Sequence, residues 1–127
     1  MTLRHKEDLN LDSLYIDLLK AVLPSGILEY FEVTGFEQKG EQLTIDMEEK
    51  NVLPEAYRGE PFHSKGFTPS VNIEDFPIRG RKVLLRIKRR RWEHQVTGEI
   101  ITRDWKMVQK GTKMTAEFAA FLKQILG

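Results

Sequence analysis

The sequence predicts an α+β fold in which a small antiparallel sheet is flanked by an N-terminal and a C-terminal helix. Apolar residues recur at helical spacing near each end of the chain, and they alternate with polar residues in between, as in strands. With 127 residues, 40% of them hydrophobic, the chain has the size of one ordinary domain. We therefore expect residues 1–127 to form a single domain. It would comprise an acidic helix-hairpin-loop half (1–78), a basic strand-hairpin unit (79–113) and a C-terminal helix (114–127).

The first element is expected to be an amphipathic helix that ends before Pro24. Asn10 or Asp12 is available as an N-cap, and Pro24, Ser25 and Gly26 stop the helical pattern. Side chains three and four residues apart share one side of a helix, so these residues would form an apolar face. The apolar residues at this spacing are Leu11, Leu14, Tyr15, Leu18, Leu19 and Val22.

Residues 31–48 predict a β-hairpin with one apolar and one acidic face. Phe31 and Val33 alternate with polar residues, and the alternation resumes after a turn at Lys39 and Gly40. The apolar residues of the second strand are Leu43, Ile45 and Met47, and their polar neighbours are Thr44, Asp46 and Glu48.

Residues 51–71 are expected to form a long ordered loop without a regular element. Proline and glycine interrupt this segment five times, at Pro54, Gly59, Pro61, Gly66 and Pro69. Three aromatic residues, Tyr57, Phe62 and Phe67, would anchor it to the core.

Residues 73–91 predict one or two strands, interrupted near residues 76–77 and at Gly80. Val83, Leu85 and Ile87 share one face of the second strand. The next large apolar residue, Trp92, is even-numbered, so a bulge or bend is expected within residues 88–91.

The end of the chain predicts a returning strand and a helix. A two-residue turn at residues 97–98 would return residues 100–105 and pair Arg91 with Asp104 and Arg90 with Trp105. Beyond it, Thr115 is an available N-cap for a final helix. The apolar residues at helical spacing there are Met114, Phe118, Phe121, Leu122 and Ile125.

The charges are segregated along the chain, although the net charge is only +1. Residues 1–78 contain 7 Lys and Arg against 15 Asp and Glu, whereas residues 79–113 contain 12 against 3. A strongly basic segment of this kind indicates a polyanionic partner.

Nucleic acid is the polyanion that this basic segment fits best. The guanidinium group binds phosphate with two parallel hydrogen bonds, and neutralising about five phosphates gives a salt slope of log K near −4.5. Phosphate contacts position a protein on DNA without reading its sequence. The residues expected to contact phosphate are Arg79, Arg81, Arg86, Lys88, Arg89, Arg90, Arg91 and Arg103.

Other interpretations of the basic segment remain open. Charged side chains also protect exposed strand edges, and this segment can pair with the acidic half of the same chain. Trp92 and Trp105 fit either the core or stacking on bases. An RNA-binding domain would use the same arginines but would be expected to expose an aromatic platform.

The sequence lacks the motifs of an enzyme, a cofactor site or a metal site. It contains no P-loop, glycine fingerprint or Ser/His/Asp arrangement, so we expect no catalysis and no cofactor. His5, His63 and His94 lack partners at ligand spacing, and the carboxylates of residues 48–49 and 74–75 are expected to be solvated. The absence of cysteine fits a reducing cytoplasmic location, and no apolar run is long enough to cross a membrane.

Three segments carry a resemblance to a known family: His63-Ser64-Lys65-Gly66-Phe67, Asp75-Phe76-Pro77-Ile78-Arg79-Gly80-Arg81-Lys82-Val83-Leu84-Leu85-Arg86-Ile87 and Arg89-Arg90-Arg91-Trp92. Roughly from Phe62 to Gly127, the chain resembles the N-terminal domain of insertion-sequence transposases of the ISL group. It resembles the ISAon-type transposase N-terminal region proteins more closely, over nearly its whole length.

The resemblance implies a zinc-ribbon-like basic hairpin, followed in the broader group by a helix-turn-helix and a DDE catalytic domain. The cysteines of that ribbon would fall near His94 and Gly98, and this chain has none, so the ribbon is expected to be metal-free. Packing of Phe62, Phe67, Trp92 and Trp105 would then replace the metal.

The resemblance also implies a role for the chain in a split transposase. Its last helix resembles the opening helix of the helix-turn-helix, and the DDE residues are missing. The chain would therefore bind the DNA of transposon ends while a separate DDE catalytic chain supplies catalysis. The alternative is a protein-interaction module that docks the catalytic subunit.

Overall fold

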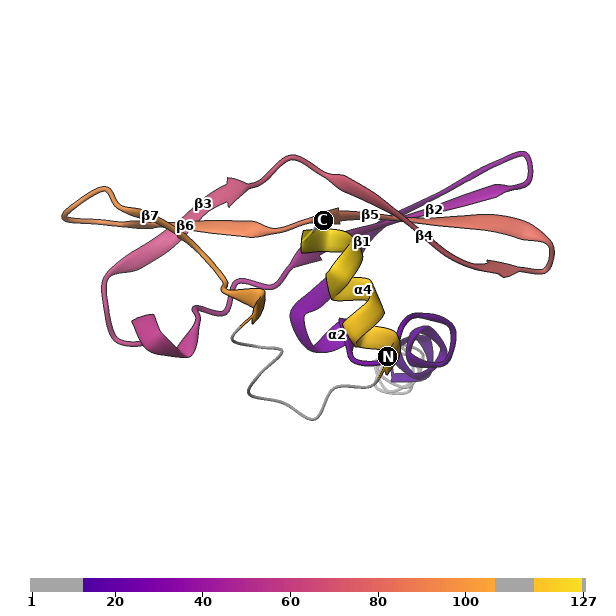
Figure 1. Cartoon of the computed structure of the whole chain (residues 1–127), viewed down its shortest axis with the longest axis horizontal. Coiled ribbons are helices and arrows are strands. Elements are labelled where there is room, and N and C mark those ends of the chain that lie inside the picture. The colour runs from indigo at the N-terminus through magenta and orange to yellow at the C-terminus, as the bar shows by residue number, and fades with distance from the viewer. Residues whose placement is uncertain (1–12, 107–115, 127) are drawn as a thin grey trace, which may run out of the picture.

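The structure is a computed structural model that describes residues 13–106 and 116–126 of the chain, and its architecture is α+β. Two sheets lie end to end along the long axis, and the helices pack against one side of them (Figure 1). The strands are β1 (Phe31–Lys39), β2 (Gln42–Glu49), β3 (Phe62–Phe67), β4 (Val71–Ile78), β5 (Arg81–Lys88), β6 (Arg90–His94) and β7 (Ile100–Thr102). The helices are residues 13–22, α2 (Ile27–Tyr30), a 3-10 turn (Glu55–Tyr57) and α4 (Ala116–Leu126).

The α+β class is confirmed, but the expectation of one antiparallel sheet is wrong. One sheet has the strand order β1-β2-β5-β4 and the other β3-β6-β7. The predicted hairpin is present as β1 and β2, yet β2 pairs with β5 in parallel, from Gln42↔Lys82 to Glu48↔Lys88. A parallel pair needs a long crossover connection, and residues 50–80 provide it here.

The main core lies between the four-stranded sheet and the helices. The odd-numbered apolar residues of β2 and β5 face this core because successive side chains of a strand point to opposite faces. Trp105 belongs to it, stacked on Phe31 with ring centroids 5.5 Å apart. The buried residues of α4 are Phe118, Phe121, Leu122 and Ile125.

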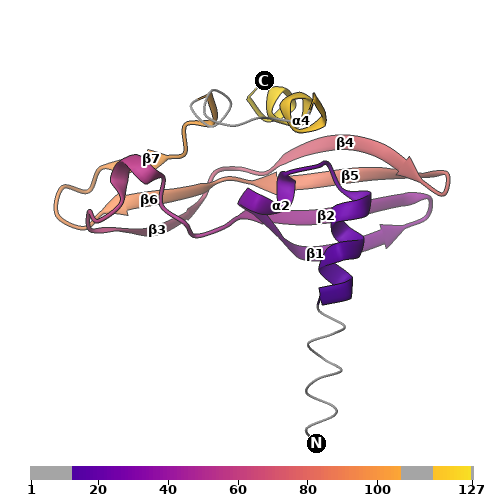
Figure 2. The same cartoon turned by 90° about the horizontal axis from the view of Figure 1, so that it is seen from below.

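A short irregularity at Arg89 joins β5 of one sheet to β6 of the other. Ile87 and Trp92 are both buried, so the buried side changes from odd to even numbers, and the predicted bulge within residues 88–91 is confirmed. Thr68 lies between β3 and β4, and its backbone N–H donates to the carbonyl of Arg89 at 2.8 Å. One ribbon thus continues from the first sheet into the second, as Figure 2 also shows.

The expectation of an irregular loop across residues 51–71 is wrong, because β3 lies within it. β3 pairs with β6 through Phe62↔His94 and Ser64↔Trp92, and the register shifts before Phe67↔Arg90. Gly66, with φ of 78°, lies at this shift, where a residue in the left-handed region forms a bulge. The glycine that seemed to interrupt a strand therefore belongs to one.

The predicted register of the last strand is wrong by two residues. Arg91 pairs with Thr102 and Trp92 with Ile101, and residues 104–105 lie outside the sheet. The connecting turn has four residues rather than two, because the backbone N–H of His94 donates to the carbonyl of Glu99 at 2.8 Å. The ring nitrogen Nδ1 of His94 accepts two backbone N–H groups and holds this turn.

The two predicted terminal helices are present over the residues that the structure describes. The first covers residues 13–22 and the second residues 116–126, whereas the expected caps and Leu11 and Met114 lie outside the described ranges. Within 13–106 and 116–126, no helix is both long and apolar enough to cross a membrane.

Candidate nucleic-acid interface

Three of the eight predicted phosphate contacts lie on one face of the two sheets, which we call the open face. It is the side opposite the described helices (Figure 1). Leu85 and Ile87 are buried toward the helices, so Arg86 and Lys88 point to the open face. Arg91 does the same in β6 because its neighbour Trp92 is buried.

Acidic residues from the first half of the chain interleave with the basic residues of β5. The parallel register places Asp46 beside Arg86, whose Nη1 lies 3.2 Å from Asp46 Oδ1. Lys82 Nζ lies 3.9 Å from Glu74 Oε1 on β4. At these positions the basic segment does pair with the acidic half of the same chain.

Two of the predicted phosphate contacts, Arg90 and Arg103, instead bind a buried carboxylate. Glu49 is only 1% exposed, and Nε of Arg103 donates to its Oε2 at 2.9 Å. The backbone N–H of Arg90 donates to Glu49 Oε1 at 3.1 Å, and Arg90 Nε donates to the Glu49 carbonyl at 3.0 Å. Arg90 also donates to Ser64 Oγ, so its guanidinium group is occupied within the protein.

Aromatic rings enclose the guanidinium group of Arg103. Its central carbon lies 5.4 Å from the ring centroid of Tyr30, 5.9 Å from Trp92 and 5.8 Å from Trp105. Because Trp105 belongs to the main core and Trp92 to the three-stranded sheet, Arg103 and Glu49 connect the two sheets.

The expectation that the carboxylate of Glu49 is solvated is wrong. Leu43, Ile45 and Met47 occupy the odd positions of β2, and Glu49 is the next odd position. The alternation that predicted the hairpin therefore already indicated a buried side chain at residue 49. What it did not reveal was the partner, since Arg103 is 54 residues away in the sequence.

Burial raises the pKa of Glu49 above its usual value of 4.5, and the hydrogen bonds from Arg103 and Arg90 lower it only in part. Burial also raises the pKa of Asp75 above 3.8, and the charge of Glu117 adds to this effect. Both groups therefore bind their proton more tightly in the folded state.

We expect stability to depend on pH through Glu49. Because the pKa of Glu49 is higher in the folded state than its usual value of 4.5, protonation of Glu49 stabilises the fold below pH 4.5. This stabilisation is lost as the pH rises through the folded-state pKa. The free energy of unfolding should therefore fall as the pH rises over this interval. The fall should be smaller in Glu49→Gln, where only the titration of Asp75 still contributes. Urea unfolding between about pH 4 and 8 tests this, and equal slopes for the two proteins would contradict it.

Three basic residues at the joint between the sheets are not committed to acidic partners. Lys88, Arg89 and Arg91, which we call the junction cluster, form no ion pair within the described residues, and all three are half-buried. Arg91 Nη2 donates to the carbonyl of Lys65 at 3.3 Å.

Two further arginines of the predicted set lie at the β4–β5 turn, at one end of the long axis (Figures 1 and 2). Arg79 is exposed and Arg81 is half-buried, and neither forms an ion pair with a described residue. We call them the tip pair. The junction cluster and the tip pair are the five predicted contacts that the protein leaves available.

The three-stranded sheet is held by packing and hydrogen bonds. Trp92 is fully buried, and its indole N–H donates to Asn51 Oδ1 at 2.9 Å. His94 and Phe62 pack edge to face with centroids 4.9 Å apart. Trp105, expected to pack with them, lies instead in the main core. Among the described residues, no group of three His, Cys, Asp or Glu is placed to hold a metal ion.

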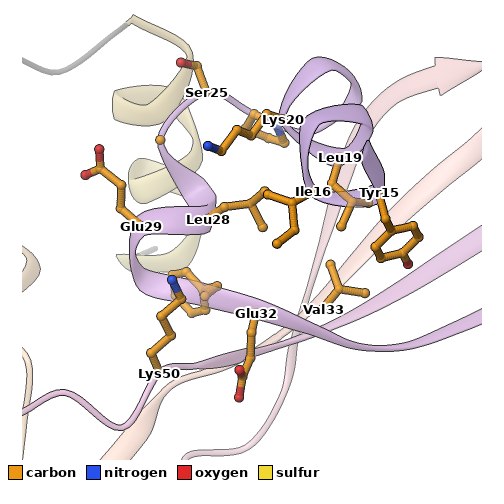
Figure 3. Close-up of a pocket in the computed structure, with 13 residues that line it drawn as sticks. Tyr15, Ile16, Leu19, Lys20, Ser25, Leu28, Glu29, Glu32, Val33 and Lys50 are labelled. Carbon is orange, nitrogen blue, oxygen red and sulfur yellow. The ribbon is translucent and has the colours of Figure 1, made fainter. Parts of the chain in front are cut away.

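A groove of about 810 Å³ lies between the first helix and β1. Ile16 and Leu19 of the helix face Leu28 and Val33 across it, as Figure 3 shows. The outer side of the same helix carries a second apolar surface, which we call the outer stripe. Its members are Leu14, Leu18 and Val22, which are 64%, 60% and 42% exposed.

The fold and the site define an α+β chain with two sheets, one face that the described helices leave uncovered, and two groups of basic residues without acidic partners among the described residues. Comparisons with protein-family models, curated proteins and solved structures each find no match for it.

Proposed function

We propose that this chain is a non-catalytic DNA-binding module that contacts phosphates through the junction cluster and the tip pair. The observation that carries this proposal is that five basic side chains on one continuous ribbon lack acidic partners among the described residues. Acidic residues neutralise much of the remaining open face, so the DNA would contact these two groups rather than the whole surface. Arg90 and Arg103 would act indirectly, by holding Glu49 and the joint in place.

The separation of the two groups suits one DNA duplex. Arg81 and Lys88 are the ends of β5, and seven residues of a strand span about 23 Å. With a rise of about 3.4 Å per base pair, this length corresponds to roughly seven base pairs. Arg81 is in phase with the buried residues Val83 and Leu85 and so points to the helix side. A single duplex along the open face would therefore meet the junction cluster and, at the apex of the β4–β5 turn, Arg79.

The finer proposal is the N-terminal module of a split insertion-sequence transposase that binds transposon ends beside a DDE catalytic chain. Its support is the similarity of the segments between His63 and Trp92 to that family. The three-stranded sheet β3-β6-β7 would be the metal-free counterpart of the zinc ribbon, with Trp92 packed at its centre.

We expect binding to duplex DNA to weaken steeply with salt and to depend on the junction cluster. In Lys88→Gln/Arg89→Gln/Arg91→Gln, three phosphate contacts are lost, so the slope of log K against log salt should become shallower by about 2.7. Fluorescence anisotropy with a labelled duplex across a salt series measures this slope. Preference for the terminal repeat of the insertion sequence that encodes the chain, over a scrambled duplex, would support the transposase role.

The matched control is Lys20→Gln/Arg58→Gln/Lys123→Gln. It removes the same charge from exposed residues on or beside helical elements. The proposal requires this variant to bind almost as the unmodified protein does. Equal weakening in both variants would show a general charge effect, and no binding at low salt would overturn the DNA-binding function.

A protein-interaction module is the second candidate, favoured by the outer stripe of the first helix. A helix with apolar residues on both its inner and outer sides is typical of an element that is covered on both. The partner would be the DDE catalytic chain. If the chain is a protein-interaction module, Lys88→Gln/Arg89→Gln/Arg91→Gln keeps its function and Leu18→Glu loses it. A DNA-binding module is expected to give the reverse result.

A further inference from the structure

Arg79 has a backbone conformation that its side chain disfavours. Its φ is 52°, and no other residue except glycine has a positive φ in the part of the chain that the structure describes. It occupies the first position of a two-residue turn closed by the Ile78↔Arg81 pair, with Gly80 (φ 74°) in the second. Such turns need positive φ at both positions and strongly prefer Asn-Gly or Gly-Gly.

The other two-residue turn in the same sheet has the residue that the geometry favours. It is closed by the Lys39↔Gln42 pair, and its first position is Gly40 with φ of 56°. Glycine reaches this region without a steric penalty, whereas a residue with a Cβ does not. The second residue of the β1–β2 turn, Glu41, has no positive φ, so the two turns differ in type, but both have a positive φ at the first position and only the β4–β5 turn places a residue with a Cβ there.

Nothing inside the described protein accounts for the arginine. Its side chain is exposed and forms no hydrogen bond or ion pair with a described residue. The turn requires a positive φ at this position but does not require an arginine, and residues held in disfavoured backbone conformations cluster at sites that contact ligands. The neighbouring Arg81 forms no ion pair with a described residue, whereas Lys82 is paired with Glu74, so an anionic ligand is the natural one.

We propose that Arg79 enters the minor groove of duplex DNA and gives the protein a preference for narrow, A·T-rich sites. This inference rests on the proposed DNA-binding function and adds a means of discrimination to it. Narrow minor grooves have an enhanced negative potential that attracts an inserted arginine. Guanine places an amino group in the minor groove, so G·C pairs disfavour the same insertion.

The surroundings of the turn favour the minor groove over the major groove. The major groove admits an isolated two-stranded ribbon, but β5 is flanked by β4 on one side and by β2 on the other from Lys82 onward. A sheet of this width does not fit into either groove. A single side chain at the apex of the turn does fit the minor groove, which is about 6 Å wide.

The test compares Arg79→Asn with the unmodified protein on three duplexes of one length, rich in A·T, G·C or I·C pairs. Inosine lacks the amino group of guanine in the minor groove but keeps its acceptors in the major groove. We expect the unmodified protein to bind the A·T and I·C duplexes roughly tenfold more tightly than the G·C duplex. Arg79→Asn should lose this preference.

The same variant should be at least as stable as the unmodified protein, because it places the favoured Asn-Gly pair in the turn. A higher urea midpoint together with lost discrimination would separate a contact to DNA from a role in folding. Lys39→Asn is the matched control, since it removes one charge at the end of β1, beside the neighbouring turn, and should keep the preference.

Two results would overturn the inference while leaving DNA binding intact. One is an I·C duplex that behaves like G·C, combined with weaker binding when 7-deazaguanine removes a major-groove acceptor. The other is an Arg79→Asn variant that binds all three duplexes more weakly by one common factor, which indicates a phosphate contact. Absence of duplex binding by the unmodified protein would instead contradict the proposed function itself.

Discussion

Arg103→Ala is expected to lower the free energy of unfolding by about 3–5 kcal/mol, because it leaves the carboxylate of Glu49 buried without its charged partner. Glu49 is 1% exposed, and the Arg103 side chain is only 12% exposed. The substitution also removes the guanidinium group that packs against the rings of Tyr30, Trp92 and Trp105. Urea denaturation monitored by tryptophan fluorescence measures the loss.

Arg86→Ala is the control for this prediction. Arg86 also pairs with a carboxylate, but its side chain is 40% exposed and that of Asp46 is 34% exposed. An exposed ion pair contributes about 0–1 kcal/mol, so this variant should lose little stability. Similar losses in the two variants would show that burial of the Glu49 pair has no special weight.

Trp92→Ala is expected to cost about 3–5 kcal/mol and to affect the three-stranded sheet first. Trp92 is fully buried in the central strand of that sheet and lies outside the main core cluster. Amide hydrogen exchange should therefore accelerate in β3, β6 and β7 before it does in β2 and β5. Uniform acceleration over both sheets would mean that they unfold as one unit.

Trp92→Phe separates packing from the hydrogen bond. Phenylalanine keeps most of the apolar surface but cannot donate to Asn51 Oδ1, which accepts the indole N–H at 2.9 Å. We expect a loss of about 1–3 kcal/mol, the cost of a buried polar group without its partner. A phenylalanine variant as unstable as the alanine variant would place the whole effect in the hydrogen bond.

The elements that the sequence predicted correctly are those determined by local periodicity. The alternation in residues 43–47 located β2, and the change from odd to even numbering before Trp92 placed a bulge within residues 88–91, where the structure has the joint. β3 was missed because Gly66 and Pro61 resemble loop residues, although a strand tolerates glycine at a bulge. The parallel pairing of β2 with β5 has no local signal, since it depends on contacts between distant segments.

The candidate site was predicted as a set of basic residues but not as an arrangement. Composition identified the arginines, yet their partners are set by strand pairing: β2 brings Asp46 to Arg86, and Glu49 to Arg90 and Arg103. The strained conformation of Arg79 likewise appears only in the turn geometry. Charge along a sequence therefore identifies candidate contacts, and the tertiary fold decides which of them remain available.

The Glu49 network has a mechanical consequence for any long ligand on the open face. It fastens the end of β2 to β6 and to the segment after β7, at the point where one ribbon passes between the sheets. The two sheets are therefore held rigidly at the joint, and the distance between the junction cluster and the tip pair is fixed. A duplex that touches both groups would have to adapt its own curvature to the protein, so pre-bent and straight duplexes of equal sequence should differ in affinity.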